Sequence, residues 1–277
     1  MTIMQPNRKP RAGFSQDQFC NGSKTRRVSL CLLAACLLQF ARLATADDSV
    51  PTEKQAAGDV ARHAKAIAGY DQVLKLDPGQ AETWQRRGEE HFKLGHIQEA
   101  ISDFDRFLEL KPEQSSYHWQ RGLALYYAGR FADGRKQFEL HQTVNPNDVE
   151  NAAWLFLCVA REAGAEKARA ALLPIKGDGR VPMMEVHALF AGKAKPDDVL
   201  KAAGGEGLPA SQLNRQLFYA HLYLGLYFEV MGDKAKSLEH LRQAAGQYQT
   251  NDYMGDVARV HLQLRDSTSV RAGDKKN

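Results

Sequence analysis

The sequence predicts an all-α protein in which pairs of helices stack into a repeat solenoid. Two observations carry this prediction. Apolar residues recur at steps of three and four, the period of a helix with one buried face, and whole columns of residues recur at a spacing of 34. The columns are Pro78, Pro112 and Pro146; Leu76, Leu110 and Val144; Gly88 and Gly122; Gly95 and Gly129; and Tyr70, Phe104 and Phe138.

Residues 81–112 show how one unit is built. A first helix has a buried stripe at Trp84, Gly88, His91 and Phe92, and a second has one at Ile97, Ala100, Ile101, Phe104 and Leu108. Gly95 ends the first helix because glycine tolerates the left-handed conformation of a helix exit. Pro112 ends the second because it lacks an N–H and clashes with the preceding turn. This hairpin resembles the tetratricopeptide repeat, whose helix pairs stack into a superhelix.

The unit varies along the chain. Residues 115–146 keep the glycine, phenylalanine and proline columns but carry Gly134 where the family prefers alanine. In the first unit, about 50–78, only the second helix is well marked, and we expect a short, polar first helix that forms a terminal cap. A further repeat is clear at 218–244, where two glycines again lie seven residues apart.

The remaining segments are also predicted to be mostly helical. Residues 149–173 have the pattern of a hairpin, 174–182 that of a loop, and 183–191 and 196–203 those of two short helices. GGEGLPAS is the linker before the last repeat, and a final helix at about 252–265 caps the array. The predicted segments are the leader 1–46, the N-terminal repeats 47–173, the helical insert and linker 174–215, the C-terminal repeat and cap 216–266, and a disordered tail 267–277.

Composition limits the function classes. Of the 277 residues, 43% are hydrophobic and 25% charged, which is typical of a globular protein. The formal net charge is +4, but residues 1–46 hold seven Lys or Arg and one Asp, which leaves residues 47–277 at −2. A near-neutral body has no basic footprint for nucleic acid. Outside the leader the only cysteine is Cys158, so the body has no disulfide framework, and we expect this thiol in the core.

The leader has the pattern of a secretory signal. Residues 25–46, TRRVSLCLLAACLLQFARLATA, are basic, then apolar, then small, and the apolar run is shorter than the about 20 residues that span a membrane. We expect export with cleavage after Ala46. Alternatively, Leu33-Ala34-Ala35-Cys36 has the form of a lipid-attachment box that would tether the chain through Cys36, although the run after Cys36 is apolar. A twin-arginine export signal or an organellar transit peptide would also match parts of this stretch.

Four stretches carry a narrower resemblance. They are HWQRGLALYYAGR, NPNDVENAAWLFLCVAREAG, MMEVHALFAGKAKPDDVL and the unit at 218–244. In content and order they resemble the NlpI-type bacterial lipoproteins, which have tetratricopeptide repeats and a non-repeat helical insert before the last one. The resemblance covers most of residues 50–265. It implies a periplasm-facing adaptor that forms homodimers and presents cell-wall hydrolases to a processing protease, and it adds weight to lipidation of Cys36.

The first helix of each pair in this architecture lines a concave groove. We predict that this groove binds an apolar or mixed segment of a partner protein, as a helix or in an extended form. The candidate residues are Gln85, Glu89, Phe92, Trp119, Leu123, Tyr126 and Tyr127. The aromatic ones are the expected anchors, although Tyr126 and Tyr127 could instead pack in the seam between repeats. These positions lack the Lys and Asn that grip a C-terminal carboxylate in other repeat domains.

No motif predicts an enzyme, a metal site or a cofactor. The nine histidines include no HExxH pair, and CxxC, the G-x-S-x-G elbow and the phosphate loop are all absent from the sequence. We therefore expect a non-enzymatic adaptor of the bacterial cell envelope. A structural envelope protein that self-associates without transient clients is a second reading of the sequence. An enzyme with an unrecognised site is a more distant third.

Overall fold

The computed structural model describes the backbone of residues 53–273 and the side chains of residues 57–265, and within these ranges the chain forms helices and no strands. The all-α prediction is confirmed. The helices are α2 (Glu53–Leu76), α3 (Ala81–Lys93), α4 (Ile97–Leu110), the 3-10 helix η1 (Pro112–Tyr117), α5 (Trp119–Tyr127), α6 (Phe131–Gln142), α7 (Val149–Ala163), α8 (Ala165–Ala170), α9 (Met183–Phe190), α10 (Pro196–Ala203), α11 (Ala210–Val230), α12 (Lys234–Ala245) and α13 (Tyr253–Gly273). The predicted leader, with Cys36 and the cleavage site after Ala46, lies outside the described residues.

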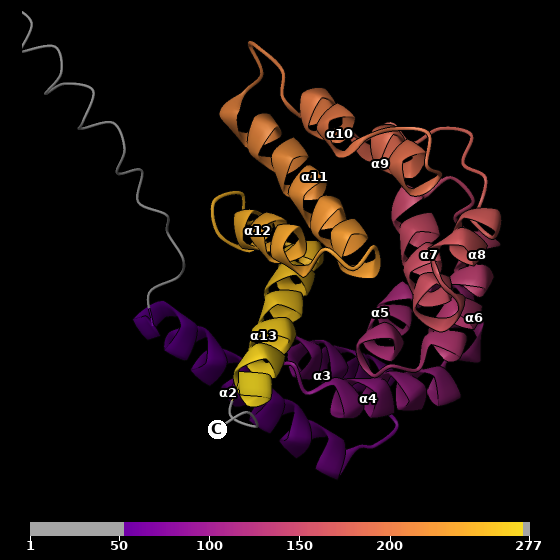
Figure 1. Ribbon diagram of the computed structural model, residues 1–277. Helices are drawn as coiled ribbons and strands as arrows, with labels where there is room; N and C mark the ends of the chain where they lie inside the picture. The colour runs from indigo at the N-terminus through magenta and orange to yellow at the C-terminus, as the bar shows by residue number, and fades with distance from the viewer. Residues whose placement is uncertain (1–52, 274–277) are drawn as a thin grey trace, which may run out of the picture. The chain divides into compact units, whose positions relative to one another are not determined.

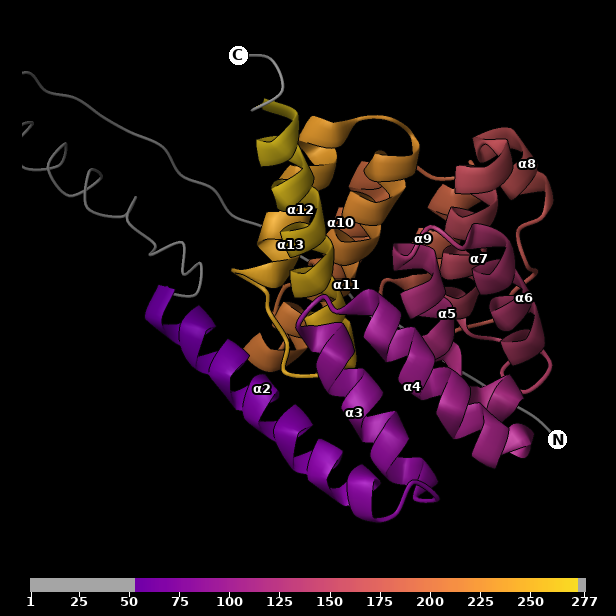
Figure 2. The same ribbon diagram turned by 90° about the horizontal axis from the view of Figure 1, so that it is seen from below.

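Three helix hairpins correspond to the clearest repeats of the sequence: α3 with α4, α5 with α6, and α11 with α12 (Figures 1 and 2). Gly95 and Gly129 have φ angles of 74° and 75°, the left-handed conformation expected at the exits of α3 and α5. Gly88 and Gly122 each pack against the ring of the phenylalanine 16 residues later. The 34-residue spacing of these columns therefore arises because the same contact between paired helices is repeated in each unit.

The first unit differs from the expectation. Residues 53–76 form one continuous helix of 24 residues, α2, instead of a short polar helix followed by a second one. Gly58 and Gly69 lie inside it without positive φ, and no proline interrupts it, so nothing in this segment supplies a turn. α2 packs along α3 at the end of the array (Figure 2).

The middle of the chain contains the most deeply buried helix. Ten of the 15 residues of α7 are buried, including Cys158, which packs in the core as predicted. α9 and α10 lie at the positions expected for the two short helices of the insert. Gly134 approaches Cys158, where an added Cβ would lie 3.1 Å from Sγ. The contact with α7 explains why this repeat has glycine where alanine is usual.

Two C-terminal boundaries differ from the predicted ones. α11 begins at Ala210 and runs across the predicted division at 215/216, since Pro209 precedes a stretch of good helix formers. α13 continues to Gly273, although a disordered tail was expected from Ser267, because that stretch contains no proline to end the helix. Among the described helices, none combines the length and the apolar character that a membrane span requires.

α13 brings the C-terminal part of the chain onto the N-terminal repeats. It follows α12 and also contacts α3, as both views show (Figures 1 and 2). The Tyr127 hydroxyl lies 3.1 Å from Nδ1 of His261 in α13. The Tyr126 hydroxyl donates to a Glu229 oxygen, also at 3.1 Å. The inner face of α3 and α5 is therefore covered by the protein's own C-terminal helices.

Candidate functional site

Three of the predicted groove residues do not face an open groove. Phe92, Leu123 and Tyr126 are at most 1% exposed. The Tyr253 ring at the start of α13 stacks on the Phe92 ring, with centroids 5.4 Å apart. The prediction is wrong for these three side chains because it treated the array as open, whereas the C-terminal helices α11 and α13 pack against its inner face.

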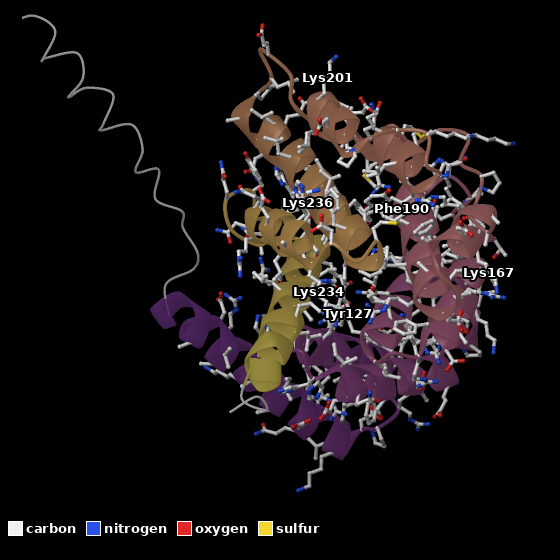
Figure 3. All side chains as sticks on the ribbon, viewed as in Figure 1. Tyr127, Lys167, Phe190, Lys201, Lys234 and Lys236 are labelled. Atoms are coloured by element: carbon white, nitrogen blue, oxygen red, sulfur yellow. The ribbon has the colours of Figure 1, made fainter. Side chains whose placement is uncertain are left out.

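Three further candidates are also engaged within the chain. The Gln85 amide donates to Glu89 at 2.9 Å and to Gln120 at 2.8 Å. The Gln120 amide in turn donates to Glu89 at 2.8 Å. Tyr127 lies in the interior next to α13, as Figure 3 shows, where it contacts His261. These side chains join neighbouring helices of the chain.

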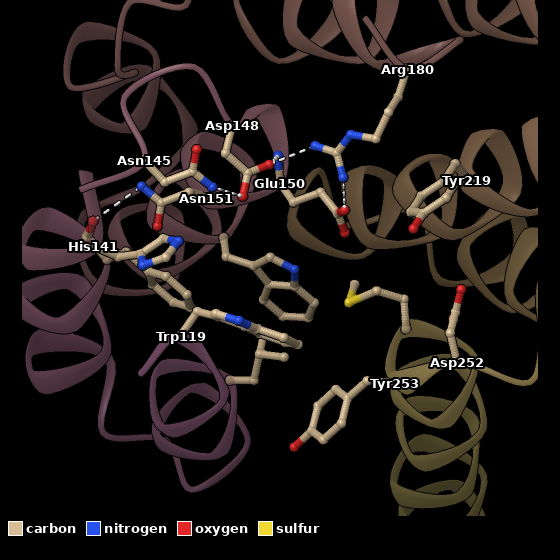
Figure 4. Close-up of a pocket in the computed structure, with 14 residues that line it drawn as sticks. Trp119, His141, Asn145, Asp148, Glu150, Asn151, Arg180, Tyr219, Asp252 and Tyr253 are labelled. Carbon is tan, nitrogen blue, oxygen red and sulfur yellow. Dashed lines mark hydrogen bonds and ion pairs between the residues drawn. The ribbon is translucent and has the colours of Figure 1, made fainter. Parts of the chain in front are cut away.

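Trp119 remains partly accessible and borders a pocket of about 350 Å³ (Figure 4). Leu123, although buried, forms part of the pocket wall beside Trp119. The pocket is lined by Trp119, Leu123, Phe138, His141, Asn145, Asp148, Glu150, Asn151, Trp154, Arg180, Tyr219, Asp252, Tyr253 and Met254. Its walls come from α5, α6, the start of α7, the loop after α8, α11 and the start of α13.

One wall is aromatic. The Trp119 and Tyr253 rings meet edge to face, with centroids 5.1 Å apart and an interplanar angle of 85°. Trp154 forms part of the lining and is 2% exposed, and its indole Nε1 has no hydrogen-bond partner among the described residues. An unpartnered buried donor is uncommon in proteins and costs free energy unless a ligand or water satisfies it.

The opposite wall is charged and is organised by Arg180. Its Nε donates to Asp178 at 2.9 Å, its Nη2 lies 2.6 Å from both Asp148 and Asp178, and its Nη1 pairs with Glu150. The contacts raise the pKa of Arg180 above its already high value. Burial opposes ionisation of Asp178, but hydrogen bonds from Arg180 outweigh it and lower the pKa of that carboxyl. Each nitrogen of the guanidinium thus has a carboxylate partner.

Glu150 sits deepest among these acids. Its side chain is 14% exposed, and Tyr223 donates to its Oε2 at 2.7 Å. Burial raises its pKa to about 7, against the attraction of Arg180. Asp252 is exposed at the mouth of the pocket and accepts hydrogen bonds from the backbone of Gly255 and the hydroxyl of Thr250. The pocket therefore joins an aromatic wall to an acidic one.

A second hollow of about 230 Å³ adjoins the pocket. Arg180 and Tyr219 border both, and Gln216 lines the second. Gln216 is 8% exposed, and its Oε1 has no hydrogen-bond partner. An extended chain leaving the pocket over Arg180 and Tyr219 would pass this amide.

Most residues of this pocket were not among the predicted site residues. Asp148 and Glu150 belong to the NPNDVEN segment at the start of α7, Arg180 to a loop, and Tyr253 to the capping helix. The one local signal of the pocket was the pair of acids Asp148 and Glu150 at the start of a helix. In the sequence this pair is indistinguishable from an ordinary helix cap. Their partner in the loop is about 30 residues away, and only folding brings the two together.

The described residues contain no group of three or more His, Cys, Asp or Glu side chains that could hold a metal ion. Cys158 is fully buried, and burial raises the pKa of its thiol. A thiol in this setting packs as a small apolar side chain.

Comparisons with known proteins give a family match and similarities to solved structures. Residues 54–118 match the family model described as "Tetratricopeptide repeat". A tetratricopeptide repeat protein from Parabacteroides merdae is similar in structure, with a TM-score of 0.44 and 16% sequence identity, over 74% of this chain and 78% of that one. No curated protein matches the chain.

Proposed function

The chain is a tetratricopeptide-repeat protein, and from this premise we propose that it is a protein-binding adaptor that holds a client segment in the pocket beside Trp119. Tetratricopeptide repeats are a protein-interaction fold, and we propose no enzymatic activity. The observation that carries the proposal is the pocket itself. It is concave, it has an aromatic wall, and it contains polar atoms without partners, as binding sites for ligand side chains do.

The two hollows favour an extended client over a helical one. Together they form a track over Arg180 and Tyr219, with the larger hollow at one end and the Gln216 amide at the other. The inner groove, where a helix would otherwise lie, holds α13. An extended segment can place one side chain in the pocket and run its backbone past Gln216.

We place this adaptor in the bacterial cell envelope. The proposal rests on the signal-like residues 25–46 and on the resemblance to NlpI-type lipoproteins. Cell-wall hydrolases and a processing protease are the clients that the resemblance suggests. Mass spectrometry of the mature chain tests export: an N-terminus at Asp47 supports a diffusing adaptor, and lipidated Cys36 supports a tethered one. An intact leader on the mature chain would contradict export.

Substitution of the anchor tests the adaptor role. Trp119→Ala should weaken the capture of clients from the envelope fraction and leave self-association unchanged, because it removes an aromatic wall of the pocket. Tyr117→Ala is the matched control, since Tyr117 is 57% exposed and lies outside the pocket. Loss of self-association without loss of a client would favour a structural protein instead.

A further inference from the structure

We propose that the pocket selects a lysine or arginine side chain of the client. This inference rests on the proposed adaptor function and specifies its chemistry. Three features of the pocket carry it: an excess of acidic groups, an arginine whose three nitrogens already bind carboxylates of the chain, and an aromatic wall beside an unpartnered acceptor.

The charges around the pocket do not balance. Asp148, Glu150 and Asp252 line it with Arg180, and Asp178 pairs with the same arginine from behind the wall. Even with Glu150 protonated, the lining holds the carboxylates of Asp148 and Asp252 against the single guanidinium of Arg180, which Asp178 also neutralises from behind. A cationic side chain would reduce this excess, and an anionic one would add to it.

Arg180 cannot offer a clamp to an acidic ligand. Four of its five N–H groups bond to carboxylates of the chain, so bidentate capture of a ligand carboxylate would break an existing ion pair. A C-terminal carboxylate or a glutamate side chain of the client would therefore have to compete with the acids of the chain for this arginine. The role of Arg180 is to hold the loop after α8 against the start of α7.

The aromatic wall and the unpartnered oxygen of Asn151 fit a cation with several donors. Trp119 and Tyr253 present ring surface at the pocket, and such rings attract ammonium and guanidinium groups. Asn151 is 3% exposed, lines the pocket, and has an Oδ1 without a partner. An ammonium has three donors and no acceptor, so it can bind this oxygen and a carboxylate together.

Short peptides test this selectivity on the full chain. The probes are Ac-Ala-Xaa-Ala-NH2 with lysine, arginine, norleucine or glutamate at the centre. The readout is the indole N–H signal in 15N NMR, because the chain has three tryptophans and two of them line the pocket. The third, Trp84, already donates to the Pro78 carbonyl at 3.0 Å and serves as an internal control.

Lysine and arginine peptides should shift the signals of Trp119 and Trp154 and leave Trp84 unmoved. Their affinity should exceed that of the norleucine peptide about fivefold or more. Asp252→Asn should weaken lysine-peptide binding about threefold or more without affecting norleucine, since an amide oxygen still caps α13. The control is Asp233→Asn, which alters an equivalent helix cap that does not line the pocket.

Three outcomes would overturn the inference: equal binding of norleucine and lysine, binding of the glutamate peptide, or no shift of either pocket indole with any peptide. Failure here is distinct from failure of the adaptor role. Clients lost with Trp119→Ala while norleucine binds as well as lysine would refute only the cation selectivity. Selective lysine binding without any client in the cell envelope would refute only the adaptor.

Discussion

At the scale of single residues, the distance between paired helices requires glycine at two positions of the repeat, Gly88 and Gly122. A Cβ added at Gly122 would lie 2.7 Å from the Phe138 ring, and one at Gly88 would lie 2.7 Å from the Phe104 ring. Both rings are buried, and each belongs to the second helix of its hairpin. A methyl group at either position must therefore push the paired helices apart.

Gly122→Ala should lower the free energy of unfolding by about 1–3 kcal/mol, the usual cost of overpacking a core. Urea denaturation measures the change. Gly177→Ala is the control, because a Cβ there meets nothing within 4 Å, and its effect should stay within about 0.5 kcal/mol. Equal stability of the two variants would show that α5 and α6 can separate without cost.

Buried histidines make the fold sensitive to acid. Burial lowers the pKa of His118 and of His261 to about 4, from an ordinary value of 6.5. Below pH 6.5 these imidazoles become protonated in the unfolded chain, whereas in the folded chain they stay neutral until about pH 4. The free energy of unfolding therefore has its full value above pH 6.5 and falls as the pH is lowered toward 4.

His118→Asn should make unfolding less sensitive to pH between 6.5 and 4. Asparagine can still accept from the Arg121 N–H that His118 caps at 3.2 Å, but it does not titrate. Each pKa unit corresponds to about 1.4 kcal/mol, so the wild type should lose roughly 3 kcal/mol more than the variant over this window. His96→Asn, at an exposed position, is the control. Parallel pH profiles of His118→Asn and wild type would contradict this account.

At the scale of elements, α13 is held by a buried charge cluster around Glu229. The Glu229 side chain is 11% exposed and faces His261 at 3.5 Å, Arg161 at 3.8 Å, and Arg265. Burial alone would raise the pKa of Glu229, but His261 and Arg265 outweigh it and lower that pKa. Two of these three partners belong to α13, so the cluster ties that helix to α11.

Glu229→Gln should destabilise the protein by about 1–3 kcal/mol, because it leaves the partly buried Arg161 and Arg265 without their counter-charge. Hydrogen exchange should accelerate first in α13. Glu139→Gln removes a surface pair with Arg135, in which both side chains are 47% exposed, and should cost under about 1 kcal/mol. Unchanged exchange in α13 would mean that aromatic packing alone holds the helix.

At the scale of the whole described region, contacts far apart in sequence tie the ends of the array together. In an open solenoid each repeat touches only its neighbours. Here α11 contacts α7, α13 contacts α3, and hydrogen bonds join Tyr126 and Tyr127 of α5 to the C-terminal helices. We therefore expect the C-terminal hairpin and the N-terminal repeats to unfold together.

Gly225→Ala tests this coupling, since its Cβ would lie 2.6 Å from Leu241 and would strain the α11–α12 hairpin. Hydrogen exchange should accelerate in α5 as well as in α11 to α13. Acceleration confined to the C-terminal helices would show independent units, as in a linear repeat array.

The helices, their pairing and the repeat register could be predicted from the sequence because they depend on local chemistry. Helical periodicity, the glycine turns and the prolines all act within one 34-residue unit. The predictions of α9, α10 and the buried Cys158 rest on the same kind of signal. Prediction failed where a local signal was missing, as in the uninterrupted α2 and at the end of α13.

Only the tertiary structure decided which face of the array is open to a binding partner. The aromatic residues of α3 and α5 have the same pattern whether they line an open groove or pack against another helix. The return of the C-terminal helices selected packing, for Phe92 against α13 and for Tyr126 against α11. The pocket with Arg180 joins residues from six segments. The 34-residue pattern determined the unit, and long-range contacts, which leave no periodic trace in the sequence, determined the site.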